Sequence, residues 1–293
     1  MFDCVGKFVV RKKMHVKIHG KPWLPVYDMD IPELEDKSYP GWNVQEHIKR
    51  VGYWAAAESY IMCKVLEENK GVVLDIGANT GYFTLLGLAM GCSVISVEAS
   101  PVHYYYLKQS LELNGWDCKY VNAFVSDLKE NVDFDGWSGK KGVMHDGNVV
   151  KCGTVAMKDL CPNGALFTKI DVEGAEPDVL RSARPLLKEG KFDYIMFEIT
   201  YVVHGEIDKE QIQMLRDLVE DGFVLYDILE RDLRLIGNID SYVDFYWWKE
   251  YKNCHLKACP GLQFAGTNIL AVHKSCVSVV FGQKTFYGYR LDV

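Results

Sequence analysis

The stretch from Val72 to Glu98 constrains this chain more than any other part of its sequence. An apolar run ends in Asp75, a turn containing Gly77 and Gly81 follows, and a helix-like segment leads to a second apolar run that ends at Glu98. This order predicts a strand, a tight turn, a helix and a second strand. A carboxylate at the end of the second strand can accept both hydroxyls of a ribose, so the unit is typical of nucleoside binding.

The spacing of the glycines indicates which nucleoside the turn could hold. A dinucleotide fingerprint has a glycine two residues after the first, so that backbone can approach a pyrophosphate, and Asn79 occupies that position here. The pattern from Asp75 to Gly81 is D-x-G-x-x-x-G instead. It resembles motif I of class I S-adenosylmethionine-dependent methyltransferases, whose cofactor carries a cationic sulfonium and an amino-acid tail but no phosphate. The turn therefore disfavours NAD and FAD.

The composition limits the partners of the chain. Its 293 residues are 48% apolar, which is ample for a core, and the formal charge of −7 comes from 33 basic and 40 acidic residues. A general nucleic-acid binder usually carries a basic face, so we expect no nucleic-acid partner. The N-terminus has no apolar core of a signal peptide. The uncharged run 76–97 is broken by Gly, Asn, Thr and Ser, so we expect no membrane span.

The cysteines favour a reduced, cytoplasmic setting. They number nine, which is odd, and Cys63 and Cys92 sit in apolar runs where a cysteine behaves as a small core residue. Cys254, His255 and Cys259 are close in sequence, but no second pair of ligands completes a zinc site.

From Gly71 onward, apolar strand-like runs alternate with helix-like segments. Strands are expected at 72–76, 93–97, 119–125, 166–171, 193–199, 223–229 and 268–273. Helices are expected at 81–90, 101–114, 176–189 and 208–221. Such alternation predicts an α/β fold with a mainly parallel sheet, here of seven strands, that has helices on both faces. Together with this alternation, the resemblance of the glycine turn to motif I implies a Rossmann-like class I methyltransferase fold. Parallel topology gathers the carboxylates at strand ends along one edge, where ligands bind.

The sequence also predicts the organisation of the chain around that sheet. Residues 1–70 form an N-terminal extension and lead-in helix, 71–275 the methyltransferase domain, and 276–293 a C-terminal tail. Within the extension, 8–10 and 15–18 alternate like a hairpin, 25–42 is expected as loop, and about 44–69 as helical. Within the domain, 129–151 is expected as a long loop or hairpin, and 230–265 as a substrate-cap insertion. The aromatic run 242–251 could cap the cofactor edge, but core packing is favoured for it, with one or two rings that reach the pocket.

A second motif, Phe167 to Leu187, supports a more specific resemblance. The chain resembles the FkbM-type methyltransferase family. The matching pieces are LDIGANTGYFT (74–84), Glu98 with Ser100–Pro101, LNG (113–115), Ser126–Asp127, KIDVEGAE (169–176) with VL (179–180), and FE (197–198). The resemblance covers about 72–200 well and 201–275 weakly. The family often has a histidine soon after the glutamate that matches Glu198, whereas here the nearest is His204.

The resemblance implies methyl transfer from S-adenosylmethionine to a hydroxyl of a sugar, glycan or small metabolite. One alternative is a nucleic-acid base methyltransferase, although such enzymes that act on exocyclic amines usually carry an Asn/Asp-Pro-Pro-aromatic motif where this chain has DVEG. Another alternative is a decayed methyltransferase fold that only binds. The acceptor pocket would come from 1–65, 129–160 and 230–265, and fold-level analogy does not identify the acceptor.

Two groups of residues are the candidates for function. For the cofactor they are Asp75, Gly77, Ala78, Asn79, Gly81, Glu98, Ser126 and Asp127. For catalysis they are Asp171, Glu173, Glu198 and His204. A carboxylate or His204 could take the hydroxyl proton. Alternatively, Asp171, Glu173 and Glu198 could hold Mg²⁺ or Mn²⁺, which prefer hard oxygen ligands; the metal-free route is slightly favoured.

Overall fold

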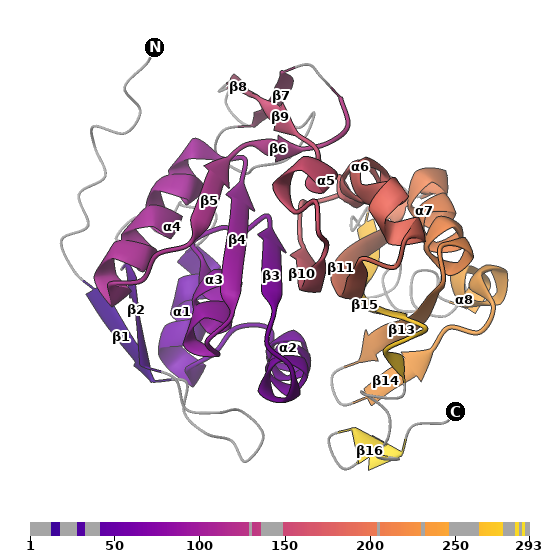
Figure 1. Cartoon of the computed structure of the whole chain (residues 1–293), viewed down its shortest axis with the longest axis horizontal. Coiled ribbons are helices and arrows are strands. Elements are labelled where there is room, and N and C mark those ends of the chain that lie inside the picture. Colours follow the sequence, from indigo (N-terminus) through magenta and orange to yellow (C-terminus); the bar gives the residue numbers. More distant parts are fainter. Residues whose placement is uncertain are drawn as a thin grey trace.

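The structure, a computed structural model, describes residues 13–17, 28–32, 42–128, 131–135, 149–203, 206–229, 232–245, 264–277, 285–286 and 289–290. A large twisted sheet runs through its centre with helices on both faces (Figure 1). The sheet strands are β3 (Val72–Ile76), β4 (Ser93–Glu98), β5 (Lys119–Asn122), β10 (Ala165–Ile170), β11 (Phe192–Val203), β12 (Glu206–Ile207), β13 (Phe223–Leu229), β14 (Asp232–Leu235) and β15 (Phe264–His273).

The order of the strands is β14-β13-β15-β11-β10-β3-β4-β5, with β12 pairing to β11. The pairs from β5 to β11 are parallel, whereas β15 lies antiparallel between β11 and β13. The predicted mainly parallel α/β sheet is confirmed, but it has nine strands rather than seven. The two additional strands are β14, which extends the edge beyond β13, and the short β12, which folds back on the end of β11.

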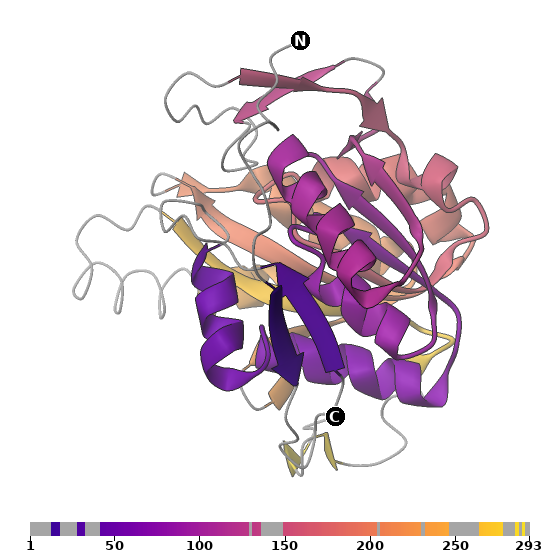
Figure 2. The same cartoon turned by 90° about the vertical axis from the view of Figure 1, so that its left-hand side faces the viewer.

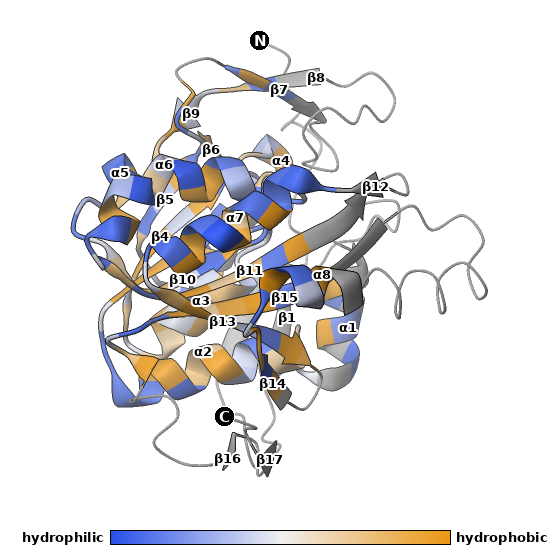
Figure 3. Ribbon diagram, turned by 90° about the vertical axis from the view of Figure 1, so that its right-hand side faces the viewer, coloured by the Kyte–Doolittle hydropathy of each residue, from blue (hydrophilic) through white to orange (hydrophobic). Residues whose placement is uncertain are grey.

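The helices are α1 (Trp42–Val51), α2 (Ala56–Glu68), α3 (Tyr82–Ala89), α4 (Pro101–Asn114), α5 (Met157–Leu160), α6 (Glu176–Lys188), α7 (Lys209–Glu220) and α8 (Ile239–Phe245). Their apolar sides form two buried clusters, one on each face of the sheet. Side chains of α1 to α4 belong to one cluster and those of α5 to α8 to the other. Hydrophilic residues lie on the outward sides of α6 and α7 (Figure 3).

Neighbouring residues on each central strand contribute to opposite clusters. Val73 packs with the first cluster and Leu74 with the second, and Tyr194 and Ile195 divide in the same way. This alternation follows from the strand period of two residues. Both faces of the sheet are covered, so residues on both sides of each central strand are apolar. This is why these strands are continuous apolar runs in the sequence.

The predicted helical segment 44–69 is divided into two helices, α1 and α2. Gly52 at φ 86° and Ala55 at φ 43° both lie in the left-handed region, which interrupts the α-helical backbone between α1 and α2. The interruption redirects the chain, and it brings Tyr53 and Trp54 to the wall of a cavity described below.

The extension also contains an antiparallel pair of strands, β1 (Lys13–Lys17) and β2 (Asp28–Pro32). The pair lies against α4 and α1 (Figure 2). The prediction of loop across 25–42 is therefore wrong at β2. The predicted partner segment 8–10 lies outside the described residues.

Three further short pairs complete the described strands. They are β6 (Phe124–Val125) with β9 (Thr154–Val155), β7 (Val132–Asp135) with β8 (Val149–Cys152), and β16 (Thr285–Phe286) with β17 (Tyr289–Arg290). The β7–β8 pair realises the hairpin alternative predicted for 129–151. Within 230–265, β14 extends the sheet, and α8 packs on its core through Tyr242 and Val243, as expected for the start of the aromatic run. Residues 246–263 lie outside the described residues, so the substrate cap stays a prediction. None of the described helices is long and apolar enough to cross a bilayer.

Candidate functional site

The turn after β3 is held tightly against two neighbouring strands. The N–H groups of Gly77 and Ala78 donate to the carbonyl of Val97 at 2.9 and 3.0 Å. Gly77 has φ 77°, and a Cβ atom there would lie 1.8 Å from the carbonyl oxygen of Asp171. The position therefore requires glycine, for its backbone conformation and for the space around it.

Glu98 organises the same turn from the end of β4. Its Oε2 accepts the N–H of Asn79 at 2.7 Å, and its Oε1 accepts the N–H of Ser100 at 2.8 Å. The residue is only 6% exposed, and the Nδ1 atom of His103 lies 3.8 Å from Oε1. A carboxylate has about four acceptor positions, so two remain for donors in the adjoining cavity.

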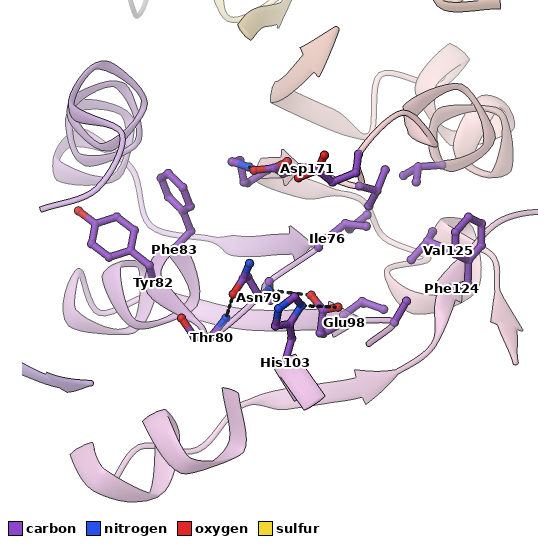
Figure 4. A pocket seen from close by; sticks show the side chains of 18 of the residues that line it. Ile76, Asn79, Thr80, Tyr82, Phe83, Glu98, His103, Phe124, Val125 and Asp171 are labelled. Carbon is purple, nitrogen blue, oxygen red and sulfur yellow. Dashed lines mark hydrogen bonds and ion pairs between the residues drawn. The ribbon is translucent and has the colours of Figure 1, made fainter. Parts of the chain in front are cut away.

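A cavity of about 180 Å³ lies over this turn. In Figure 4, Asp171 and Glu98 lie on opposite sides of it, with Tyr82 and Phe83 towards one end and Phe124 and Val125 towards the other. We call it the first cavity. The predicted cofactor residues that line it are Gly77, Ala78, Asn79 and Glu98, and the predicted catalytic residues that line it are Asp171 and Glu173.

Two predicted cofactor residues shape the turn from below and do not line the cavity. Asp75 is 1% exposed and accepts the hydroxyl proton of Thr84 at 2.6 Å, while burial raises the pKa of Asp75 to about 6. Gly81, at φ 97°, starts α3, and a Cβ there would lie 2.8 Å from the side chain of Leu107 on α4. Both residues therefore help to fix the conformation of the turn, and neither is part of the cavity wall.

Ser126 and Asp127 also lie outside the wall of the first cavity. Ser126 is buried, and its hydroxyl accepts the N–H of Leu128 at 3.2 Å. Asp127 is exposed. At this end the cavity wall consists of the preceding residues, Phe124 and Val125.

A second cavity, of about 520 Å³, adjoins the first. The two share four wall residues, Trp54, Phe83, Lys169 and Asp171. The remaining residues of the second wall are His47, Tyr53, Ala55, Ala56, Glu58, Glu198 and Asn268. Asp171 therefore belongs to both cavities, whereas Glu198 belongs to the second alone.

Lys169 and Asp171 form an ion pair on the shared wall. Their Nζ and Oδ2 atoms are 2.9 Å apart, and the side chains are 5% and 40% exposed. The ammonium also lies over the ring of Phe83, 5.1 Å from its centre. A buried ammonium needs such partners, because desolvation of an isolated charge is costly.

Glu198 lies opposite Asn268 in the β11–β15 pairing, and Asn268 donates its side-chain amide to Glu58 of α2 at 2.8 Å. Burial, with the negative charges of Asp171 and Glu173, raises the pKa of Glu198 to about 7, although Lys169 opposes the shift. Burial also raises the pKa of Glu58. Both carboxyls thus lie in surroundings that disfavour negative charge.

The remaining predicted catalytic residues are placed differently. Glu173 is exposed, with φ 55°, and lines the first cavity only. Glu176, in the same motif, is buried and accepts the N–H groups of Val172 and Gly174 at 3.2 and 3.3 Å, so it holds the turn before α6. His204 lies outside the described residues.

The predicted metal site is not supported by the donor geometry. Within the described part of the chain, no three His, Cys, Asp or Glu side chains are close enough to hold an ion. At Asp171 the carboxylate is already occupied by the ammonium of Lys169. The proposals below therefore use no metal.

Sequence reasoning did not identify several residues that line the two cavities. Lys169 was inside the KIDVEGAE motif but was given no role, and His103 follows Glu98 by only five positions. Glu58 and Asn268 come from segments with no motif of their own. Their only signal was position, since Asn268 begins an expected strand and Glu58 lies in the expected helical segment that precedes the first strand of the sheet.

The strand order, with one antiparallel strand inserted near an edge and a carboxylate at the end of β4, defines a Rossmann-like class I methyltransferase fold. The FkbM methyltransferase domain matches residues 75–225, and the chain belongs to this family. No curated protein is similar enough to count as a match.

The similarity of this chain to solved structures is low in both sequence identity and TM-score. The FkbM methyltransferase of Methylobacillus flagellatus has 17% identity over 43% of this chain, with a TM-score of 0.32, and the match spans only 32% of that protein. The precorrin-6y C5,15-methyltransferase of Geobacter metallireducens has 9% identity over 73% of this chain and 86% of its own, with a TM-score of 0.37. The Pyrococcus abyssi tRNA (uracil-54, C5)-methyltransferase, in complex with S-adenosyl-L-homocysteine, has 13% identity over 48% of this chain and 28% of its own, with a TM-score of 0.31. Likenesses at this level carry no argument about substrate.

Proposed function

We propose that this protein transfers a methyl group from S-adenosylmethionine to a hydroxyl of a sugar, glycan or small metabolite. The observation that carries the proposal is the shared wall of the two cavities, with Asp171 in both. One cavity can hold the methyl donor and the other the acceptor, so that the two reacting groups meet at that wall. Holding two reactants in such geometry supplies much of the rate enhancement in a group transfer.

The first cavity suits the cofactor. The free acceptor positions of Glu98 can receive the two ribose hydroxyls, and Phe124 and Val125 offer apolar surface to a flat base. The amino-acid tail of the cofactor would lie against the glycine turn, whose Gly77, Ala78 and Asn79 line the cavity. Asp171 and Glu173 supply negative charge on the wall near a cationic sulfonium.

Among the described residues, Glu198 is the best-placed general base. When bound, the cofactor supplies a methyl group already activated by its positive sulfur. Glu198 would take the proton of the acceptor hydroxyl as the new oxygen–carbon bond forms and the sulfur–carbon bond breaks, which leaves a neutral thioether. A base is most effective when its pKa is close to the working pH, and burial raises the pKa of Glu198 to about 7.

Asp171 would have a different part in the reaction. Its carboxylate is paired with Lys169 at 2.9 Å, so it is less available for a proton than Glu198. We propose that the Lys169–Asp171 ion pair holds these two charges in place on the wall that the two cavities share. His204 stays a predicted base, and Ser126 and Asp127 stay predicted cofactor residues.

The remaining predictions about partners and setting form part of this proposal. A nucleic-acid acceptor is disfavoured, because Glu58, Asp171 and Glu198 line the second cavity and would face an anionic backbone. All six cysteines within the described residues are free thiols, which fits a reduced, cytoplasmic setting: Cys63, Cys92, Cys118, Cys152, Cys161 and Cys276.

Two measurements test the proposal. Calorimetry should detect binding of S-adenosylmethionine, and an acceptor screen with methyl-labelled cofactor should show label transfer to hydroxylated compounds that a chelator leaves unchanged. Absence of heat in the folded protein would favour the decayed, binding-only fold. Transfer into tRNA or duplex DNA with none into sugars would contradict the acceptor class.

A further inference from the structure

The wall of the second cavity combines aromatic surface with carboxylates. Trp54 and Phe83 line it, and His47 stacks edge-on to Trp54 with ring centres 5.4 Å apart. Flat apolar rings beside polar groups suit the alternating C–H and O–H faces of a sugar ring.

The charges of this wall are unbalanced. Three carboxylates, from Glu58, Asp171 and Glu198, face one ammonium, that of Lys169. Lys169 already binds Asp171, and the amide of Asn268 already binds Glu58. These two donors are thus engaged with wall carboxylates, and the wall holds more carboxyl groups than cations.

The carboxylates come from three separate elements and cannot relax apart easily. Glu58 is on α2, Asp171 follows β10, and Glu198 is on β11 next to Asn268 of β15. Burial raises the pKa of both Glu58 and Glu198, and neighbouring carboxylates add to each shift. A further anion would increase this repulsion, whereas hydroxyl or ammonium donors would relieve it.

Resting on the proposed function, we propose that the second cavity is the acceptor site and selects hydroxyl-rich groups that are uncharged or carry an amine. It discriminates against acceptors with a phosphate or carboxylate near the reacting hydroxyl. Glu58 is the specificity-determining residue, because it adds a carboxylate that the matched domain, residues 75–225, does not contain.

Binding of matched sugars to the protein loaded with S-adenosylhomocysteine tests the charge selection. The probes are glucose, glucosamine, glucuronate and glucose 6-phosphate, with the galactose series in parallel, measured by saturation-transfer NMR and titration. Glucose and glucosamine, or their galactose counterparts, should bind at least about tenfold more tightly than the anionic members, which corresponds to about 1.4 kcal/mol. Equal or tighter binding of the anions, or no binding by any member, overturns the proposal.

Variants of Glu58 test its part. Glu58→Gln should lower the preference for glucosamine over glucuronate by roughly three- to tenfold, and Glu58→Asp, which keeps the charge, should restore most of it. Glu112→Gln, at a half-exposed carboxylate on α4, is the matched control and should change nothing. An unchanged preference in Glu58→Gln overturns the assignment. Calorimetry with S-adenosylmethionine is run on each variant, so a failure of cofactor binding is recognised separately from a failure of acceptor selection.

Discussion

Glu198 and Asn268 stand opposite each other on β11 and the antiparallel strand β15, at the edge of the second cavity. This pairing joins the predicted catalytic edge of the sheet to α2, since Asn268 also holds Glu58. It places two carboxyls with raised pKa values on one wall, beside the Lys169–Asp171 ion pair. The predictions below follow from this arrangement and from the glycine turn that faces it.

Turnover should rise with pH and reach half its maximum near pH 7, because Glu198 must be ionised to accept a proton and its pKa is about 7. Glu198→Gln cannot accept that proton and should lose about a hundred- to ten-thousandfold in kcat. Label transfer to the acceptor found by screening, measured from pH 5 to 9, checks both. A flat profile, or near-normal turnover by folded Glu198→Gln, would assign the base elsewhere.

The same substitution should stabilise the fold at alkaline pH. The folded-state pKa of Glu198, about 7, lies above its ordinary value of 4.5, so the stability present below pH 4.5 is lost as pH rises towards 7. Glutamine has no charge to bury. Glu198→Gln should therefore match the wild type in thermal unfolding at pH 4 and exceed it by several degrees at pH 8. A difference that stays constant with pH would show that the burial of Glu198 is not the cause.

Lys169→Met should shift the midpoint of the pH–rate profile to higher pH. Lys169 lowers the pKa of Glu198, so loss of the ammonium leaves the Glu198 carboxyl harder to ionise. Lys169→Arg keeps the positive charge and should leave the midpoint closer to that of the wild type. The measurement is the pH of half-maximal turnover, and a midpoint that falls in Lys169→Met would refute the role of Lys169.

Gly77→Ala should be far more destabilising than Gly91→Ala. The two glycines have nearly the same φ, 77° and 76°, but a Cβ at Gly77 would lie 1.8 Å from the Asp171 carbonyl oxygen, whereas nothing lies within 4 Å of one at Gly91. Gly91→Ala should cost about 1–2 kcal/mol from backbone strain alone. Urea unfolding of both variants isolates the cost of the contact, and equal midpoints would mean that the turn can move aside.

Glu98→Gln should weaken S-adenosylmethionine binding by about ten- to a hundredfold. The substitution removes the charge and one of two oxygens that accept from ribose, while also turning a donor towards the N–H of Asn79 or Ser100. Calorimetry gives the affinity and circular dichroism confirms folding. Glu67→Gln, at an exposed helix position, serves as the control. Undiminished affinity of a folded Glu98→Gln protein for S-adenosylmethionine would show that the ribose does not bind at Glu98.

The local elements of the domain were determined by the sequence. β3 and β13 begin and end where their apolar runs do, and α4 spans 101–114 as expected. Ser100, Pro101 and Gly115 set the limits of α4, through an N-cap hydrogen bond, a first-turn proline and a left-handed C-cap. The glycine turn and the position of Glu98 at the end of a strand could also be predicted from the sequence, because backbone conformation and strand ends are local properties.

Only the tertiary structure decided which of these polar residues face a cavity. Asp75 and Glu98 both end apolar runs, yet Asp75 lies beneath the turn with Thr84 while Glu98 lines the first cavity. Glu58 and Asn268 meet although they are 210 residues apart. Sequence spacing sets the order of residues along each element, but the direction of a side chain and the charges around it depend on how distant elements pack. That packing pairs Lys169 with Asp171, and it raises the pKa of the half-buried Glu198 carboxyl, which has other carboxylates nearby, to about 7.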